Sequence, residues 1–144
     1  MNSRRIVTLV ILAAFGLGAR PGQGPEVHRV MREKLECMQT ILEAMVTSNW
    51  AQLETQSREL ERLTTDPRWM VLNFQEYVRQ SATFKRRVAD LRAAATQRDL
   101  EETPKAYVAV TLGCVECHRY LARARIAGVV PRVPADLFPG LREP

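Results

Sequence analysis

The sequence predicts an all-α protein, folded as an antiparallel up-down-up-down four-helix bundle. Three observations predict the bundle. The 144-residue chain is rich in helix-forming residues, four stretches repeat their apolar residues at steps of three and four, and the links between these stretches are short. Only 6% of the residues are aromatic, and the runs of β-branched residues are short, which argues against an all-β fold.

Residues 1–19 have the layout of a secretory signal peptide. Two arginines precede an apolar run over 6–15, and small residues follow it up to Ala19. This run is shorter than the ~20 residues that a membrane-spanning helix needs. We therefore expect an exported protein in the periplasm, with membrane attachment only if the signal is not cleaved.

The rest of the chain divides into a flexible lead-in over 20–25, a bundle domain over 26–127 and a proline-rich tail over 128–144. Removal of the signal peptide leaves 19 basic and 16 acidic residues, a net charge of +3. Such a small excess of positive charge argues against binding to nucleic acid.

The first helix is expected from Glu26 to about Val46. Its expected buried stripe comprises Val27, Val30, Met31, Leu35, Met38, Ile41, Leu42, Met45 and Val46. Cys37 lies off this stripe. It is either a buried, inert thiol or a thiol that links two copies of the chain in a homodimer, which would form through the first two helices.

The second helix is expected to follow a cap at Ser48 or Asn49 and to end at Asp66-Pro67, because the residue before proline avoids the helical conformation. The third helix is expected from about Phe74 to Gln97. Asn73 and Glu76 have the spacing of a capping box at its start. The expected apolar side of the third helix comprises Phe74, Tyr77, Val78, Phe84, Val88 and Leu91.

The fourth helix is expected after a cap at Asp99 paired with Glu102. Its regular part starts near Thr103, because Pro104 is tolerated only in a first turn. The helical spacing of its apolar residues ends at Gly128. The expected inward side of this helix comprises Tyr107, Val110, Thr111, Cys114, Cys117, His118 and Leu121.

Residues 114–118 read Cys-Val-Glu-Cys-His, the C-x-x-C-H signature of covalent haem c attachment. On a helix, residues three and four apart share one face. Cys114 and Cys117 can therefore form thioethers to the two vinyl groups of one porphyrin, and His118 can bind the iron as the proximal ligand. The predicted cofactor is one covalently bound haem c.

The cysteine pair has two alternative functions, a structural zinc site and a thioredoxin-type redox pair. A structural zinc site would need four ligands, and the remaining candidates, Cys37 and His28, are nine residues apart. A thioredoxin-type pair follows a strand in a βαβ unit, and the sequence shows no such strand.

The chain resembles the class II cytochromes c, the cytochrome c-prime family of four-helix-bundle proteins. The motif over 114–118 carries the resemblance, because that family places C-x-x-C-H on its last helix. Weaker matches are the stretch over 30–46 and the tryptophan-bearing link after Pro67. The resemblance covers residues 26 to about 125.

The resemblance also implies two states of the sixth iron position. One branch of the family leaves an apolar residue there and is five-coordinate, whereas the other branch ligates the iron with a methionine of the first helix. Matching the first helix to that pattern places the distal ligand at Met31. The alternatives are no protein ligand, or ligation by Met38 or His28.

Two departures from the family argue against a gas-binding role. The aromatic residue and arginine that often follow the haem histidine are replaced by Leu121 and Ala122. The usual arginine before the distal position is replaced by Val27, so that Arg29 or Arg32 would have to meet a haem propionate.

The predicted function is one-electron transfer to and from a redox partner protein, not enzymatic turnover, because no acid–base pair or nucleophile stands out. The alternative is a five-coordinate haem protein that binds or senses a diatomic gas, NO or CO. Arg119, Arg123 and Arg125 either complement the dipole at the end of the fourth helix or form a docking patch for an acidic partner.

Overall fold

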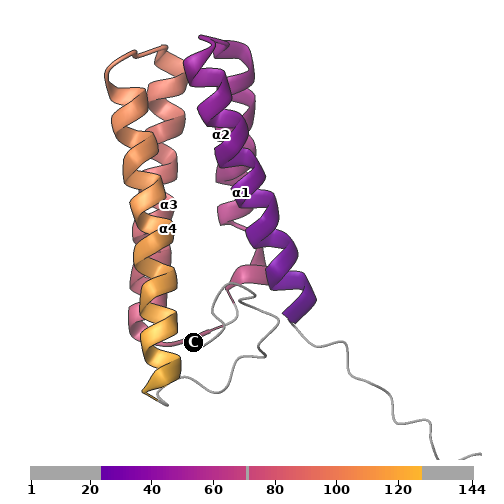
Figure 1. Cartoon of the computed structure of the whole chain (residues 1–144), viewed down its shortest axis with the longest axis vertical. Coiled ribbons are helices and arrows are strands. Elements are labelled where there is room, and N and C mark those ends of the chain that lie inside the picture. Colours follow the sequence, from indigo (N-terminus) through magenta and orange to yellow (C-terminus); the bar gives the residue numbers. More distant parts are fainter. Residues whose placement is uncertain (1–23, 71, 128–144) are drawn as a thin grey trace, which may run out of the picture.

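The computed structural model describes residues 24–70 and 72–127, and within these ranges it is all-helical, with no strand. The elements are α1 (Gly24–Val46), α2 (Trp50–Thr64), the short 3₁₀ helix η3 (Pro67–Trp69), α3 (Gln75–Gln97) and α4 (Glu102–Ile126). The four α-helices lie along one common direction, and the start of α1 and the end of α4 lie at the same end of the molecule (Figure 1). The predicted all-α class and its four helices are confirmed.

The helix α1 begins at Gly24, within the predicted lead-in, and its buried face differs from the predicted stripe. Leu35 is 49% exposed, Leu42 is 45% exposed and Val46 is more exposed still. The buried apolar residues of α1 are Val27, Val30, Cys37, Met38, Ile41 and Ala44. The helix packs closely on α2 and η3 but not on α4. One side of its wide apolar surface therefore has no helix against it.

Cys37 lies on this buried face, so its predicted position off the stripe is wrong. Its side chain is 5% exposed, and burial raises the pKa of its thiol to about 11. A protonated, covered thiol is a poor nucleophile. The structure therefore favours the inert thiol over a disulfide between two copies.

The start and end of α2 agree with the sequence. The Asn49 side chain accepts a hydrogen bond from the backbone N–H of Gln52, which is the predicted cap. The helix ends at Thr64, and Asp66 caps η3 by accepting from the backbone N–H of Arg68. The proline thus begins the short 3₁₀ helix that carries Trp69.

The predicted capping box of α3 does not form. Phe74 occupies the N-cap position without a side-chain hydrogen bond, and the helix begins at Gln75. Glu76 accepts hydrogen bonds from the side chains of Arg79 and Gln80 instead of reaching back to the cap. Val78, predicted on the apolar side, is exposed because it lies to one side of the buried row formed by Tyr77, Ser81 and Phe84.

The start of α4 agrees with the sequence, because Asp99 accepts hydrogen bonds from the backbone N–H groups of Glu101 and Glu102. Pro104 lies in the first turn. Thr111 and His118, predicted on the inward side, are exposed by their solvent-accessible area. The predicted signal peptide and the proline-rich tail lie outside the described residues.

All four α-helices and η3 contribute to the main core, α4 through Val110. Its buried members are Val30, Cys37, Met38, Ile41, Leu60, Leu63, Trp69, Phe84, Val88, Leu91 and Val110. An ion pair between Arg92 and Glu61 joins α3 to α2 at the edge of this core. None of the helices in the described part of the chain is long and apolar enough to cross a membrane.

Candidate functional site

A cavity of about 710 Å³ opens beside the main core, and α1, η3, α3 and α4 contribute to its walls. This volume falls within the range of about 300–1,000 Å³ that small-molecule and cofactor sites occupy. Its walls are mostly apolar. Residues of α1 and α4 line this cavity from facing sides, and these two helices are not among the closely packed pairs of the bundle.

The C-x-x-C-H motif lines this cavity from α4. Cys114 and Cys117 are half-buried, free thiols, and His118 borders the same space. Burial raises the pKa of both thiols, that of Cys117 to about 11 with a further contribution from Cys114. Both cysteines are therefore protonated near neutral pH.

His118 is exposed by area but is surrounded by protein on the cavity side. Burial and the positive charge of Lys34 lower the pKa of its imidazole. Both effects disfavour the imidazolium form. The neutral imidazole that results is the form that binds a metal ion.

Met31 lines the cavity from α1, so the structure brings all four predicted site residues to one space. Met38 and His28, the two alternatives to Met31, also line it. Met38 is 7% exposed and belongs to the main core, whereas Met31 is half-buried and packs against the edge of that core. Of the two methionines, Met31 is the one whose side chain is freer to turn into the cavity.

Lys34 is a cavity residue that the sequence analysis missed. It is 6% exposed, and its Nζ lies 3.2 Å from the centroid of the Trp69 ring and 5.3 Å from that of Phe84. Burial lowers the pKa of the amine to about 7. Its position three residues after Met31 and three before Cys37 could have revealed it, because this spacing places it on the buried face of α1.

Trp69 forms the wall under Lys34. Its indole Nε1–H donates to the carbonyl of Thr64 at 3.2 Å, and its own carbonyl accepts a hydrogen bond from the hydroxyl of Tyr77. Its ring meets Phe84 edge-to-face, with centroids 6.0 Å apart. The ring is therefore held from α2, α3 and its own backbone, which gives the cavity one rigid aromatic side.

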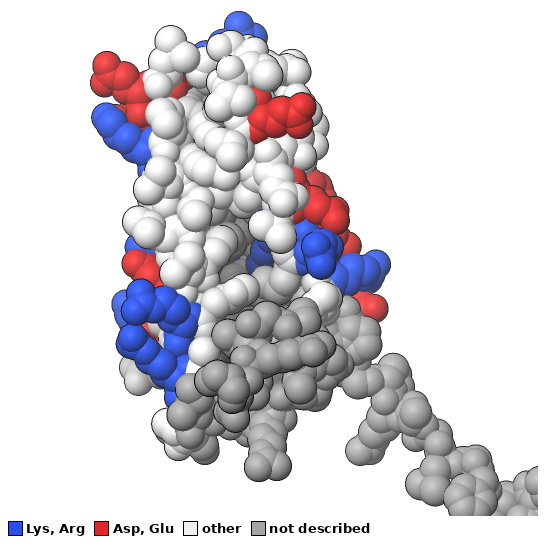
Figure 2. All heavy atoms as spheres, viewed as in Figure 1, with Lys and Arg blue, Asp and Glu red and all other residues white. Residues whose placement is uncertain are grey.

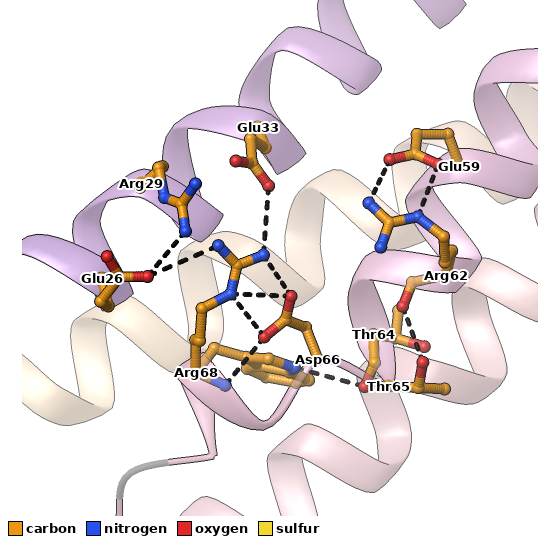
Figure 3. A network of polar contacts seen from close by, with 10 residues as sticks. Glu26, Arg29, Glu33, Glu59, Arg62, Thr64, Thr65, Asp66 and Arg68 are labelled. Carbon is orange, nitrogen blue, oxygen red and sulfur yellow. Dashed lines mark hydrogen bonds and ion pairs between the residues drawn. The ribbon is translucent and has the colours of Figure 1, made fainter. Parts of the chain in front are cut away.

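A network around Arg68 fastens η3 to α1 (Figure 3). Its guanidinium is hydrogen-bonded to the carboxylate of Asp66 and lies 3.6 Å from Glu26 and 3.7 Å from Glu33 of α1. The hydrogen bond from Arg68 lowers the pKa of Asp66 to about 2. These contacts keep the Trp69 wall in place beside α1.

Two further polar groups at the cavity suit a cofactor. The side-chain oxygens of Gln80 and Ser81 are buried and have no hydrogen-bond partner among the described residues, and both residues line the cavity. Buried polar groups are normally hydrogen-bonded. A haem has a large apolar macrocycle and two carboxylates, so apolar walls with an unpartnered Ser81 hydroxyl fit it.

The other predicted arginines separate into two groups. Arg32 and Arg119 line the cavity, whereas Arg29 is paired with Glu26 at 2.7 Å outside it. Of the two arginines predicted to meet a propionate, Arg32 lines the cavity and Arg29 does not. Ala122 also lines the cavity, and Arg123 is exposed.

Gly113 allows α4 to lie close to α3 directly before the motif. A Cβ at this position would lie 2.9 Å from Nη1 of Arg87 and 3.3 Å from the Phe84 ring. Arg87 also pairs with Glu116, inside the motif, at 2.8 Å. These contacts hold this turn of α4 against α3 and so help to set which way the motif faces.

The geometry of the described residues matches neither a zinc site nor a thioredoxin-type cysteine pair. Within residues 24–70 and 72–127, no three His, Cys, Asp or Glu side chains form a group that could hold a metal ion. Those ranges also contain no strand that could precede a redox-active cysteine pair. Comparison of the chain with models of known protein families, with curated proteins and with solved structures finds no match.

Proposed function

We propose that this chain is a periplasmic mono-haem c-type cytochrome that carries single electrons, built as an up-down-up-down bundle with the haem on its C-terminal helix. One observation carries the proposal. The C-x-x-C-H motif over 114–118 borders an apolar cavity of about 710 Å³ to which α1 contributes Met31. An apolar space of this size next to that motif is what a covalently held porphyrin requires.

Each site residue has a defined role in this proposal. Cys114 and Cys117 would hold the haem through thioethers, and His118 and Met31 would supply the protein ligands of its iron. When bound, the haem supplies an iron that takes up and releases one electron. The packed Trp69 gives the cavity one wall that need not move when the charge of the iron changes.

Transfer to a redox partner protein needs a contact surface near the cofactor. Arg119 and Arg123 are exposed on α4, directly after the motif. Positive charge near the haem edge would steer an acidic partner into contact. We propose this docking role for the two arginines, and a carrier rather than an enzyme for the whole chain.

The second candidate function is a five-coordinate haem protein that binds NO or CO. The half-buried Met31 favours it, because a side chain that is not tightly packed can turn out of the cavity. The distal space would then have apolar walls and an open coordination position. In this alternative Met31 contributes packing but no ligand.

Intact mass tests covalent attachment after expression with export and haem-attachment machinery. The mature chain should be heavier than its sequence by one haem and should begin near Ala19 or Arg20. The Cys114→Ala/Cys117→Ala double variant should lose the haem, whereas the matched Cys37→Ala should keep it. Two alkylatable thiols at positions 114 and 117 in the exported protein would refute the proposal.

The ferrous spectrum decides between the two candidate functions. A low-spin ferrous spectrum that becomes high-spin in Met31→Ala, with faster binding of CO, supports the carrier. A wild-type ferrous protein that is already high-spin, or a Met31→Ala variant with an unchanged spectrum, refutes the assignment of Met31. The first of these outcomes would favour the gas-binding protein.

A further inference from the structure

Lys34 is the one charged side chain among the buried groups of the described residues. Its amine lies over the face of Trp69, near Phe84, and makes no ion pair with a carboxylate in that part of the chain. A buried cation without an anionic partner is costly. A residue retained at such a position is a candidate for a role in the cavity that it faces.

The residue type is informative because lysine is rare in this chain. The sequence has 18 arginines and three lysines. Lys85 is half-buried on α3 and does not line the cavity, and Lys105 is an exposed partner of Glu102. An arginine stays protonated and offers no nitrogen lone pair, whereas a lysine can give up a proton and become a ligand. Lys34 is thus a basic residue of the cavity, beside His28 and His118, whose nitrogen can bind a metal ion.

Lys34 and Met31 project from the same side of α1. They are three residues apart, which places them on neighbouring positions of one helix face, and both line the cavity that α4 lines with His118. A planar macrocycle that enters this cavity must share it with the Lys34 amine. Burial among apolar walls favours the neutral amine, whereas the face of Trp69 at 3.2 Å favours the ammonium ion, so both forms have a place in this cavity.

We propose that the Lys34 amine is the sixth ligand of the ferric iron and that the Met31 sulfur replaces it on the ferrous iron. This inference rests on the proposed haem function and adds a ligand exchange to it. Amine nitrogen is a harder donor than thioether sulfur, so the two donors prefer the higher and the lower iron charge respectively.

The exchange moves one electron and one proton. On oxidation the electron passes to the redox partner protein, the Lys34 ammonium gives one proton to water, its lone pair forms the nitrogen–iron bond, and the sulfur–iron bond to Met31 breaks. On reduction the electron returns from the partner, the sulfur–iron bond forms, the nitrogen–iron bond breaks, and Lys34 takes a proton from water.

The test compares ferric and ferrous holoprotein by electron paramagnetic resonance and near-infrared absorption. The wild-type ferric protein should be low-spin and should lack the charge-transfer band of thioether-ligated ferric haem. Lys34→Arg should gain that band, because the guanidinium keeps the charge without ligating and leaves the position to Met31. Met31→Leu should leave the ferric spectrum unchanged and make the ferrous protein high-spin. Lys85→Arg is the matched control and should behave as wild type.

Three results would overturn the exchange. They are a thioether band in the wild-type ferric protein, a high-spin wild-type ferric protein, and a Lys34→Arg spectrum identical to that of wild type. The last would mean that Lys34 serves as a charge, for example beside a haem carboxylate. If Lys34→Arg does not fold, Lys34→Gln and the wild-type resonance spectrum still distinguish nitrogen from sulfur ligation. The mass increase of one haem tests the proposed function separately from these spectra.

Discussion

The two ends of the bundle are packed in different ways. At the end that holds the links over 46–50 and 97–102, called here the closed end, Ala44, Leu53 and Ala95 form a fully buried cluster. At the other end, called the cavity end, Trp69 and the C-x-x-C-H motif border the large cavity. The closed end resembles an ordinary protein interior, in which small and branched side chains leave no large void.

The cavity end has features that packing alone does not favour. It holds a buried lysine and the unpartnered side-chain oxygens of Gln80 and Ser81, whereas one such group, the hydroxyl of Thr103, lies near the closed end. In the space-filling view, most of the blue Lys and Arg side chains lie in the lower half of this face, at the cavity end (Figure 2). Departures from good packing that gather at one place mark a functional site. The difference between the ends thus separates a closely packed region from a region with a large apolar cavity, in which the proposed haem would lie.

The largest effect should come from a cavity made at the closed end. Leu53→Ala should lower the free energy of unfolding of the holoprotein by about 2–5 kcal/mol, because Leu53 is 1% exposed and its neighbours cannot fill the space. The haem spectrum should not change, since Leu53 is remote from the cavity. Urea titration followed by circular dichroism measures the loss. The matched control is Leu112→Ala on α4, which should cost far less because Leu112 is 52% exposed. A changed haem spectrum in Leu53→Ala would contradict the separation of the two ends.

A second prediction concerns the charge at the cavity end. Lys34→Met should stabilise the haem-free chain by about 1–4 kcal/mol below pH 7, because it replaces a buried amine by an apolar side chain of similar volume. The pKa of Lys34 falls from 10.5 to about 7 on folding. Between these values the unfolded chain binds more protons, so wild-type stability should rise with pH.

Lys34→Met should lack this rise, and its advantage over wild type should therefore shrink between pH 7 and pH 10. Thermal unfolding at a series of pH values tests this. The exposed Lys105→Met is the control and should give a pH-independent difference. An equal benefit from Lys34→Met at pH 6 and pH 10 would show that Lys34 is not buried as an amine.

The third prediction concerns the contacts that fasten the cavity wall to α1. Asp66 has its pKa lowered from 3.8 to about 2 by Arg68, so its contribution to stability is present above pH 4 and is lost as the pH falls through 2. The free energy of unfolding of Asp66→Asn should therefore fall less steeply than that of the wild type between about pH 4 and pH 2. Glu54→Gln, an exposed carboxylate of α2 paired with Arg58, is the control. If acid destabilised Asp66→Asn as strongly as the wild type, Arg68 would not hold this carboxylate in solution.

The smallest effect should come from Gly113→Ala. Alanine in mid-helix gains about 0.5–1 kcal/mol over glycine, but the new Cβ would meet Phe84 at 3.3 Å and displace the flexible end of Arg87. The two effects oppose each other, so the melting temperature of the holoprotein should change little. A shift of the haem absorption would show that Phe84 moved with the wall. A large gain in stability without such a shift would mean that α4 does not lie as close to α3 as described.

The local signals in the sequence were sufficient for much of the helical framework. Asn49 caps α2, the bond between Asp66 and Pro67 ends the helical segment, and Asp99 caps the start of α4. Each of these features depends on residues within a few positions of one another, so the chain specifies them before any helix packs. The capping box of α3 was wrong because Glu76 found nearer partners in Arg79 and Gln80.

The sequence alone determined the motif and its face of α4. Cysteines at 114 and 117 with a histidine at 118 share one helix face whatever surrounds them. Tertiary structure decided which apolar residues of α1 are covered and what fills the space opposite the motif. Leu35 and Leu42 are exposed and Lys34 is buried because α1 packs on α2 and η3 and leaves its α4 side open. The 3.6-residue period says which residues lie together, but only the neighbouring helices decide whether that side meets protein, solvent or a cavity.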